Sequence, residues 1–288
     1  MKYKLIVMDM DGTVLKSNHN VSRQSRNVLD RARAAGIRVT LASGRNFNNM
    51  LHIVKKLGIV EPIVSNDGAL IKDPVTGEVL FEDYFQPDCL VKILEEIHRH
   101  GLTYTINFDY ASVSNRSMNY LGFLQRMGLR AIAAGIYEKG VRVTKTHEEI
   151  VSDILDKKHK AYKVTTLNND PEAHGMEETS RWIEEHWGDC AKISYSGLKN
   201  FDVLPVHVTK SHGLIVLQEH YGINREEIIA FGDSYNDLEM LRHAGFGVAM
   251  GNASDHVKNT ADYVTKTNDS HGVAYAIEKF ILNDLDMD

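Results

Sequence analysis

The chain has 288 residues, of which 43% are hydrophobic and 25% charged, and its formal net charge is −6 at pH 7. This length predicts two domains, and the composition is typical of a folded globular protein, which excludes disordered, collagen-like and coiled-coil classes. A net acidic chain is not expected to bind nucleic acid through bulk electrostatics. No apolar run is long enough for a membrane helix or a signal-peptide core, so we expect a cytoplasmic protein that does not contact membranes.

The first part of the chain alternates between predicted strands and helices. Residues 5–8 form a short, continuous apolar run, which is typical of a parallel strand covered on both faces. A helix with Ser22 as its N-cap leads to a second strand over 37–42, and a helix capped by Asn46 leads to a third strand that begins at Pro62. This order predicts right-handed parallel crossovers and therefore an open α/β sheet.

A different pattern follows, which we interpret as an inserted domain. Residues 73–77 indicate a hairpin turn, and residues 81–87 are predicted to cross into the insertion. From there to residue 204, predicted helices are interleaved with strand-like stretches. The helices are predicted over 87–100, 116–127, 147–158 and 171–187, and the strands over 102–108 and 163–167.

The opening pattern resumes after Pro205. The elements predicted there are helix 210–221, strand 228–231, a helix through Met240 and Leu241, strand 247–250 and helix 272–283. The predicted fold class is therefore α/β, with a three-layer Rossmann-like parallel sheet core and an inserted α/β domain. We expect the core over residues 1–83 and 205–288 and the insertion over residues 84–204.

The cysteines and histidines indicate no special site. Cys89 and Cys190 could form one disulfide, but we expect two reduced thiols, as is usual in a cytosolic chain. The chain has 14 histidines, yet no pair combines helix-face spacing with a third ligand, as a zinc site would require.

Acidic residues follow two of the predicted strands directly. The first strand is followed by Asp9-Met10-Asp11-Gly12-Thr13, and strand 228–231 by Gly232-Asp233-Ser234-Tyr235-Asn236-Asp237. Either motif alone is compatible with a capping turn. In open α/β sheets, however, ligands bind at the carboxyl ends of the strands, where the two motifs would form one acidic cluster. Such carboxylates repel one another unless a cation lies among them, and hard oxygen ligands suit Mg²⁺.

Two further segments are suited to binding phosphate. Ser43-Gly44-Arg45 follows the second strand, where a hydroxyl and a glycine amide can cradle phosphoryl oxygens. Lys210 begins the helix after the insertion, where a lysine opposes the helix dipole and suggests a nearby anion. Taken alone, each signal is weak, and Lys210 by itself would be interpreted as a solvated side chain.

In order and spacing, these four segments resemble the motifs of the haloacid dehalogenase-like hydrolase superfamily. The resemblance is closest to the Cof-type phosphatases, which carry a large α/β cap inserted after the third strand. The segment 9–13 resembles the first motif, Ser43 the second, Lys210 the third and 232–237 the fourth, and residues 246–253 resemble the closing segment. The likeness covers the core, whereas the cap matches only in size and position.

The resemblance implies a Mg²⁺-dependent phosphatase that acts through an aspartyl-phosphate. Asp9 would be the nucleophile and Asp11 the acid–base group, and Mg²⁺ would be held by Asp9, Asp233 and the main-chain carbonyl of Asp11. Asp237 would brace the lysine or a metal-bound water. The groups that hold the phosphoryl oxygens would come from Ser43, Gly44, Lys210 and Asn236.

The implied substrate is a small phosphorylated metabolite, such as a sugar phosphate. The cap would choose the leaving group, and Asn107, Asp109 and Arg116 are candidates for its lining. A phosphomutase shares the nucleophile and the cap class and is the alternative enzyme. A phospho-ligand sensor without activity is the non-enzymatic alternative, although the nucleophile and the metal ligands are all present. The sequence identifies neither the substrate nor the oligomeric state.

One position departs from the family pattern. The family often has Asn-Gly-Ala after the third strand, whereas this chain has Asn66-Asp67-Gly68-Ala69. An acid then occupies the usual asparagine place, near the expected entrance for the substrate. We therefore expect Asp67→Asn to lower KM more than it raises kcat, with an effect that shrinks as added salt screens the charge.

Overall fold

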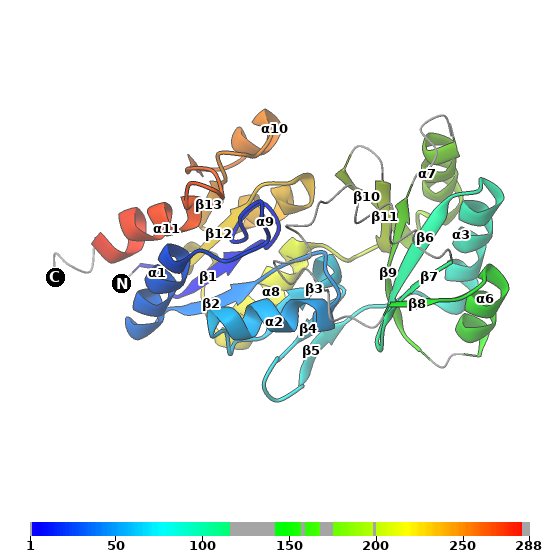
Figure 1. Cartoon of the computed structure of the whole chain (residues 1–288), viewed down its shortest axis with the longest axis horizontal. Coiled ribbons are helices and arrows are strands. Elements are labelled where there is room, and N and C mark those ends of the chain that lie inside the picture. The colour runs from blue at the N-terminus through cyan, green and yellow to red at the C-terminus, as the bar shows by residue number, and fades with distance from the viewer. Residues whose placement is uncertain (1, 116–141, 157–158, 168–174, 198–199, 284–288) are drawn as a thin grey trace. The chain divides into compact units, whose positions relative to one another are not determined.

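The computed structural model describes residues 2–115, 142–156, 159–167, 175–197 and 200–283. The described residues divide into two compact units, one from residues 2–81 and 209–283 and the other from residues between 82 and 208. Figure 1 shows the elements of both units, and each unit is described by itself. No helix in the described part of the chain is long and apolar enough to cross a membrane.

A five-stranded parallel sheet forms the centre of the first unit. Its strand order is β14-β13-β12-β1-β2 (Figure 1). Every residue of β1 and β12 is buried, so both faces of the sheet are covered. The predicted parallel core is confirmed. Its strands are β1 (Leu5–Met8), β2 (Arg38–Leu41), β12 (Ile228–Gly232), β13 (Phe246–Ala249) and β14 (Tyr263–Val264).

Helices complete the three layers of this unit. Leu5 and Val7 of β1 share one buried cluster with Leu214 and Leu241 of α8 and α9. Because side chains alternate along a strand, the other residues of β1 lie on the opposite face, and α1 packs there against β2 and α11. The helices are α1 (Arg23–Ala34), α2 (Phe47–Leu57), α8 (Lys210–Tyr221), α9 (Leu238–His243), α10 (Asp255–Lys258) and α11 (Gly272–Ile277), which continues as a π-helix over Glu278–Leu282.

The helix ends follow the local signals in the sequence. Ser22 caps α1 by accepting a hydrogen bond from the amide of Ser25, and Asn46 caps α2 in the same way. Gly58 and Gly222 end α2 and α8 in the left-handed conformation, as is typical of glycine after a helix. The predicted caps at Ser22 and Asn46 and the predicted end of the helix over 210–221 are confirmed.

A small sheet with the order β3-β4-β5 adjoins the parallel sheet. Its strands are β3 (Ile63–Ser65), β4 (Leu70–Lys72) and β5 (Val79–Glu82). Val64 of β3 forms a parallel bridge to Ala42, directly after β2, so β3 continues the strand order of the core. Asp73 stabilises the predicted turn before β5, because its carboxylate accepts hydrogen bonds from the amides of Val75 and Thr76.

The second unit contains a six-stranded sheet with the order β10-β11-β9-β6-β7-β8, packed against three described helices. Neighbouring strands are antiparallel except for β7 and β8. The strands are β6 (Thr103–Phe108), β7 (Ser112–Ser114), β8 (Arg142–Thr144), β9 (Ala161–Leu167), β10 (Ala191–Gly197) and β11 (Asn200–Pro205), and the helices α3 (Pro87–Arg99), α6 (His147–Leu155) and α7 (Gly175–Trp187). The helix predicted over 116–127 and the helix start predicted at residue 171 lie outside the described residues.

The expectation of two reduced thiols is wrong in this structure, because Cys89 and Cys190 form a disulfide. Cys89 lies on α3 and Cys190 just before β10, and their Cα atoms are 6.7 Å apart although 101 positions separate them in the chain. Packing of α3 against α7, the helix that leads to Cys190, brings the two residues together. Sequence separation contains no information about this proximity.

Candidate active site

The predicted site residues of the core follow strands that end side by side. β1 pairs in parallel with β12 on one side and with β2 on the other, so their carboxyl ends lie together. Asp9 follows β1, Ser43 follows β2 after one residue, and Asp233 follows β12. Asp9 and Ser43 are buried and Asp233 is partly buried. The sheet topology therefore brings the three predicted segments to one edge.

Lys210 lies between two of the carboxylates. It is the first residue of α8, which Thr209 caps. Its Nζ donates to Asp9 Oδ1 and to Asp237 Oδ1, each at 2.6 Å, and only 1% of the side chain is exposed. Burial alone would lower the pKa of Lys210, but the charges of Asp237 and Asp9 outweigh it and raise this pKa above its ordinary value. Lys210 is thus a buried, permanent cation and not a solvated lysine.

Asp9, Asp233 and Asp237 form an acidic cluster, in which one oxygen of each carboxylate lies within 4.8 Å of the others. One lysine balances only part of this charge. Burial raises the pKa of Asp9 well above its ordinary value, and the charges of Asp237 and Asp233 add to this while Lys210 opposes it. Burial also raises the pKa of Asp233 to about 6, against the hydrogen bond from Thr13. The cluster is therefore electrostatically unfavourable without a further cation.

The donor set fits a hard divalent cation. Asp237 is already engaged, because its Oδ1 accepts from Lys210 and its Oδ2 accepts from the amides of Asp233 and Ser234. Asp9 Oδ2 accepts no hydrogen bond among the described residues, and Asp233 Oδ2 accepts only the long one from Asn252, at 3.4 Å, so these two oxygens remain for a metal. Oxygen donors of this kind are those that Mg²⁺ prefers.

Residues whose roles the sequence did not indicate hold Asp233 in place. Thr13 Oγ1 donates to Asp233 Oδ1 at 2.7 Å. The side-chain Nδ2 of Asn252 donates to the main-chain carbonyl of Gly12 at 2.9 Å and to Asp233 Oδ2 at 3.4 Å. The main-chain amide of Asn268 in turn donates to Asn252 Oδ1. Gly12 has φ +78°, and a Cβ there would collide with the carboxylate of Asp233, so only glycine allows this approach.

Asp11, the predicted acid–base group, has its side chain bound to Arg45. Arg45 Nε and Nη2 donate to the two oxygens of Asp11 at 2.7 and 2.6 Å. The ring Nδ1 of His19 lies 3.6 Å from Asp11 Oδ1. Burial acts to raise the pKa of Asp11, but the hydrogen bonds and charge of Arg45 outweigh it and hold this pKa below its ordinary value. The sequence identified the motif that contains Arg45 but no role for this residue. Its only signal was its position directly after Ser43-Gly44.

The environment of Asp67 corrects the expectation that this acid lies at an open entrance. Asp67 is only 2% exposed, and its Oδ1 accepts a hydrogen bond from Asn236 Nδ2 at 2.8 Å. Asn66 and Asp67 both have positive φ, 50° and 56°, in the short 3-10 helix that follows β3. Gly68 next to them has φ +108°, and a Cβ there would collide with the carbonyl of Thr209. This tight turn buries the carboxylate beside Asn236, a predicted phosphate-binding residue.

The Asp67→Asn variant is still expected to lower KM for a phosphate dianion, by roughly three- to tenfold, with a smaller change in kcat. One negative charge near the anion is removed, and a change in KM of this size corresponds to about 1 kcal/mol. Because Asp67 is buried, the effect should persist at high salt, contrary to the expectation from the sequence. Steady-state kinetics at 0.05 and 0.5 M salt measure this.

Asp73→Asn provides a matched control, since it removes the same charge from an exposed turn of the same unit. Its KM should equal that of the wild type. A KM for Asp67→Asn that is unchanged, or that differs from the wild type only at low salt, would contradict a buried charge acting on the anion.

Ser43 and Gly44 lie beside the acidic residues through the β1–β2 pairing. The amide of Ser43 donates to the carbonyl of Val64 at 2.9 Å, and Ser43 Oγ accepts from the amide of Arg45 at 3.3 Å. The carbonyl of Ser43 accepts from the amide of Asp67 at 3.0 Å. The two main-chain bonds of Ser43 hold the end of β2 against β3 and the turn that follows it.

Two of the three residues that were proposed to line the cap lie in the described part of the second unit. Asn107 lies in β6, where its Oδ1 accepts from Ser112 Oγ at 2.8 Å. Asp109 follows β6 and lies 3.2 Å from the ring Nδ1 of His159. Arg116 lies outside the described residues.

Comparison with known proteins gives a consistent set of relatives. A sequence model of the haloacid dehalogenase-like hydrolases matches residues 6–277. The chain is 30% identical to phosphatase YwpJ of Bacillus subtilis, over 96% of this chain and all of that protein. It is 27% identical to the 5-amino-6-(5-phospho-D-ribitylamino)uracil phosphatase YcsE of the same organism, over 97% and 96% of the two chains. A solved haloacid dehalogenase-like hydrolase from B. subtilis superposes with a TM-score of 0.84 at 29% identity, over 96% of this chain and 100% of that one.

Proposed function

The chain belongs to the haloacid dehalogenase-like hydrolase family, and on that premise we propose that it is a Mg²⁺-dependent phosphatase of a small phosphorylated metabolite. The observation that carries this proposal is the buried contact of Asp9 with Lys210 inside a cluster of three carboxylates. The phosphatase relatives support the reaction class, and the ribityl phosphate in the name of one of them supports a sugar-like leaving group. Sugar phosphates are accordingly the substrate class that we favour.

Asp9 acts as the nucleophile in this proposal. Its carboxylate oxygen attacks phosphorus, the bond from phosphorus to the substrate oxygen breaks, and an aspartyl-phosphate forms. Asp11 gives a proton to the leaving alkoxide and later takes one from the water that hydrolyses the acyl phosphate. Phosphate leaves and Asp9 is restored. Because Arg45 holds Asp11 ionised, Asp11 must be released from this ion pair before it can act as an acid.

The remaining groups manage charge and alignment. Asp9, Asp233 and the main-chain carbonyl of Asp11 would hold Mg²⁺, which when bound neutralises charge on the phosphoryl oxygens. Lys210 adds a fixed positive charge, braced by Asp237. The groups that orient the transferring oxygens are Ser43, Gly44, Lys210 and Asn236.

The hydrolysis of a phosphate monoester requires several catalytic groups acting together. Uncatalysed hydrolysis of phosphate monoesters is so slow that enzymes accelerate it by up to ~10²¹-fold, which is about 29 kcal/mol. A single oxyanion donor contributes only about 3–4 kcal/mol, so no one residue suffices. We propose further that residues 84–204 are the inserted cap and that this domain selects the leaving group, with Asn107 and Asp109 as candidates.

A screen of phosphorylated metabolites with Mg²⁺, scored by phosphate release, tests the proposal. We expect free phosphate without any bisphosphate activator. A phosphomutase would instead return the phosphoryl group to its sugar and would need such an activator. Absence of phosphate release from every phosphomonoester would contradict the proposed reaction.

Asp233→Asn is expected to raise the Mg²⁺ concentration for half-maximal activity by at least about tenfold, because an amide is a weaker ligand than a carboxylate. Calorimetric titration of Mg²⁺ into the protein without substrate measures the same change directly. Asp262→Asn, which alters a carboxylate bound to the amide of Gly247 in the same unit, is a matched control. An unchanged Mg²⁺ titration for Asp233→Asn would contradict its assignment as a ligand.

The same variant should stabilise the metal-free protein at neutral pH. Burial raises the pKa of Asp233 to about 6, above the value of about 3.9 for an unfolded chain. Its ionisation therefore costs stability as the pH rises from about 4 through 6. In EDTA, the melting temperature of Asp233→Asn should exceed that of the wild type at pH 8, and the difference should shrink towards pH 5. A constant difference across this range would contradict the raised pKa.

A further inference from the structure

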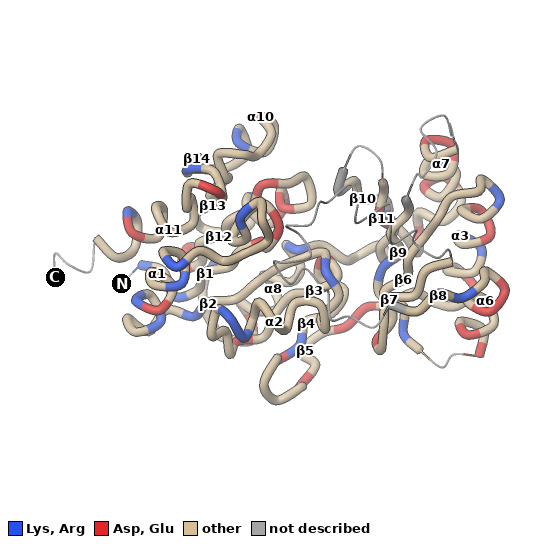
Figure 2. The backbone as a smooth tube through the Cα atoms, in the orientation of Figure 1, with Lys and Arg blue, Asp and Glu red and all other residues tan. Residues whose placement is uncertain are grey.

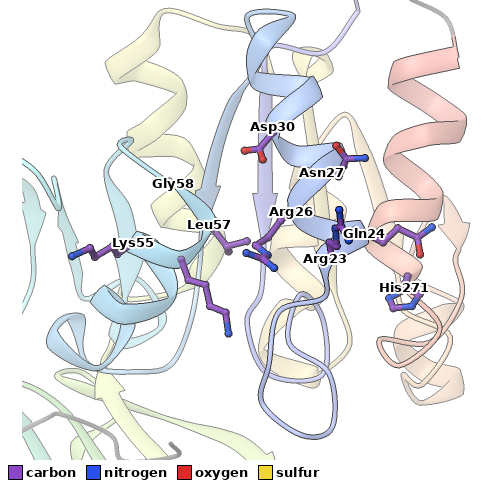
Figure 3. Close-up of a pocket in the computed structure, with 10 residues that line it drawn as sticks. Arg23, Gln24, Arg26, Asn27, Asp30, Lys55, Leu57, Gly58 and His271 are labelled. Atoms are coloured by element: carbon purple, nitrogen blue, oxygen red, sulfur yellow. The ribbon is translucent and has the colours of Figure 1, made fainter. Parts of the chain in front are cut away.

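A groove of about 980 Å³ lies in the first unit, and none of the residues that line it belongs to the candidate active site. It is bounded by α1, the end of α2 and His271 before α11 (Figure 3). Figure 3 shows the Arg26 side chain between α1 and the end of α2. The charged side chains in its lining are Arg23, Arg26, Asp30, Lys55 and Lys56.

The charge of the lining contrasts with that of the whole chain. Four cationic side chains and one carboxylate line the groove, whereas the formal net charge of the chain is −6. The carboxylate, Asp30, is already paired with Arg33, which does not line the groove. The lining therefore leaves four positive charges that no carboxylate of the groove compensates. Figure 2 shows basic positions along α1 and at the end of α2.

These four cations have no acidic partner elsewhere among the described residues. No described carboxylate lies within 4.0 Å of Arg23, Arg26, Lys55 or Lys56, and Lys56 Nζ donates only to the amide oxygen of Asn20, at 3.2 Å. Like charges that face one concave surface repel one another, and an anion between them removes this repulsion.

The helix ends indicate which cations need a further explanation. Lys55 and Lys56 lie in the last turn of α2, where the helix dipole favours positive charge. Arg23 and Arg26 lie at the start of α1, whose first turn contains no acidic residue, and there the dipole disfavours them. The placement of Arg23 and Arg26 is explained if an anion accepts hydrogen bonds from them.

We propose that this groove binds an oligophosphate, a small molecule with two or more linked phosphoryl groups. Guanidinium groups bind phosphate oxygens in bidentate fashion, and lysines add point charges. Because the cations come from two helices, an anion with charge at more than one point engages them better than a single phosphate does. The proposal is independent of the proposed hydrolytic function, since the groove shares no residue with the active site.

Calorimetric titration of tripolyphosphate at low salt, in EDTA, tests this proposal. Without metal, the carboxylates of the active site repel anions, so binding reports on other sites. We expect one equivalent of tripolyphosphate to bind the wild type at least tenfold more tightly than orthophosphate. Arg26→Gln/Lys55→Gln should weaken binding at least tenfold and leave phosphatase activity unchanged. Raising the salt concentration should weaken binding to the wild type more than to this variant.

Arg31→Gln/Lys279→Gln is the matched control, because it removes the same charge from the same unit outside the groove. Arg31 belongs to the same helix but is paired with Glu278. This control should bind tripolyphosphate within twofold of the wild type. Should the first variant not fold, Arg23→Gln/Lys56→Gln removes the other two lining cations.

Three results would overturn the proposal. The first is no stoichiometric binding of tripolyphosphate to the wild type, and the second is equal weakening in the groove variant and in the control. The third is tight binding of a 12-nucleotide single strand without binding of tripolyphosphate, which would make the groove a nucleic-acid surface instead.

Discussion

Replacing Asp9 by Asn is expected to reduce phosphate release by at least about 10³-fold, because an amide cannot attack phosphorus and form the covalent intermediate. The fold should remain intact. The oxygen of an asparagine can still accept the hydrogen bond from Lys210, and loss of one carboxylate reduces the repulsion within the acidic cluster. Phosphate release and thermal unfolding of the variant measure the two parts of this prediction.

Asp9→Glu separates the charge of this residue from its position. It keeps a carboxylate but moves it by one methylene, which displaces the nucleophile from the in-line geometry that the reaction requires. We expect this variant also to be inactive. A beryllofluoride or aluminium fluoride mimic of the phosphoryl group should bind next to Asp9 in the wild type. Turnover by Asp9→Asn within tenfold of the wild type would exclude Asp9 as the nucleophile.

Replacing Asp11 by Asn should slow phosphoryl transfer by about 10²–10⁴-fold for an alkyl phosphate and far less for p-nitrophenyl phosphate. A sugar alkoxide is a poor leaving group and needs a proton in the transition state, whereas nitrophenolate leaves as a stable anion. The comparison must use the first step, measured as a burst, because Asp11 also serves as the base in the second step. With p-nitrophenyl phosphate the variant should accumulate phosphorylated Asp9.

Arg45→Gln supplies a control for the ion pair, since Arg45 binds both oxygens of Asp11. If the effect of Asp11→Asn came only from a disturbed turn, Arg45→Gln would disturb the same turn and slow both substrates alike. Equal losses for the two substrates in the burst of Asp11→Asn would mean that Asp11 is not the acid. Its role would then be limited to shaping the turn that carries the metal ligands.

Much of the core could be predicted because its signals are local. The apolar runs of β1 and β12, the caps at Ser22 and Asn46 and the glycine after α8 each depend on a few neighbouring residues. In an open parallel sheet, these elements by themselves determine which residues lie at the carboxyl ends of the strands. The positions of Asp9 and Asp233 at one edge follow from this rule. In the second unit, β7, β8, β10 and β11 were not predicted, because the preference of a segment for a strand depends on the neighbours against which its side chains pack.

The sequence by itself therefore determined the fold class, the family and the residues that are suited to the chemistry. Only the tertiary structure decided how these residues are paired. Asp11 is bound by Arg45 across 34 positions, and Asp67 by Asn236 across 169. Such pairs depend on strand register, on the tight turn after β3 and on side-chain rotamers, none of which has a local signature. For the same reason, the buried state of Lys210, the disulfide and the basic groove at α1 became visible only in the folded chain.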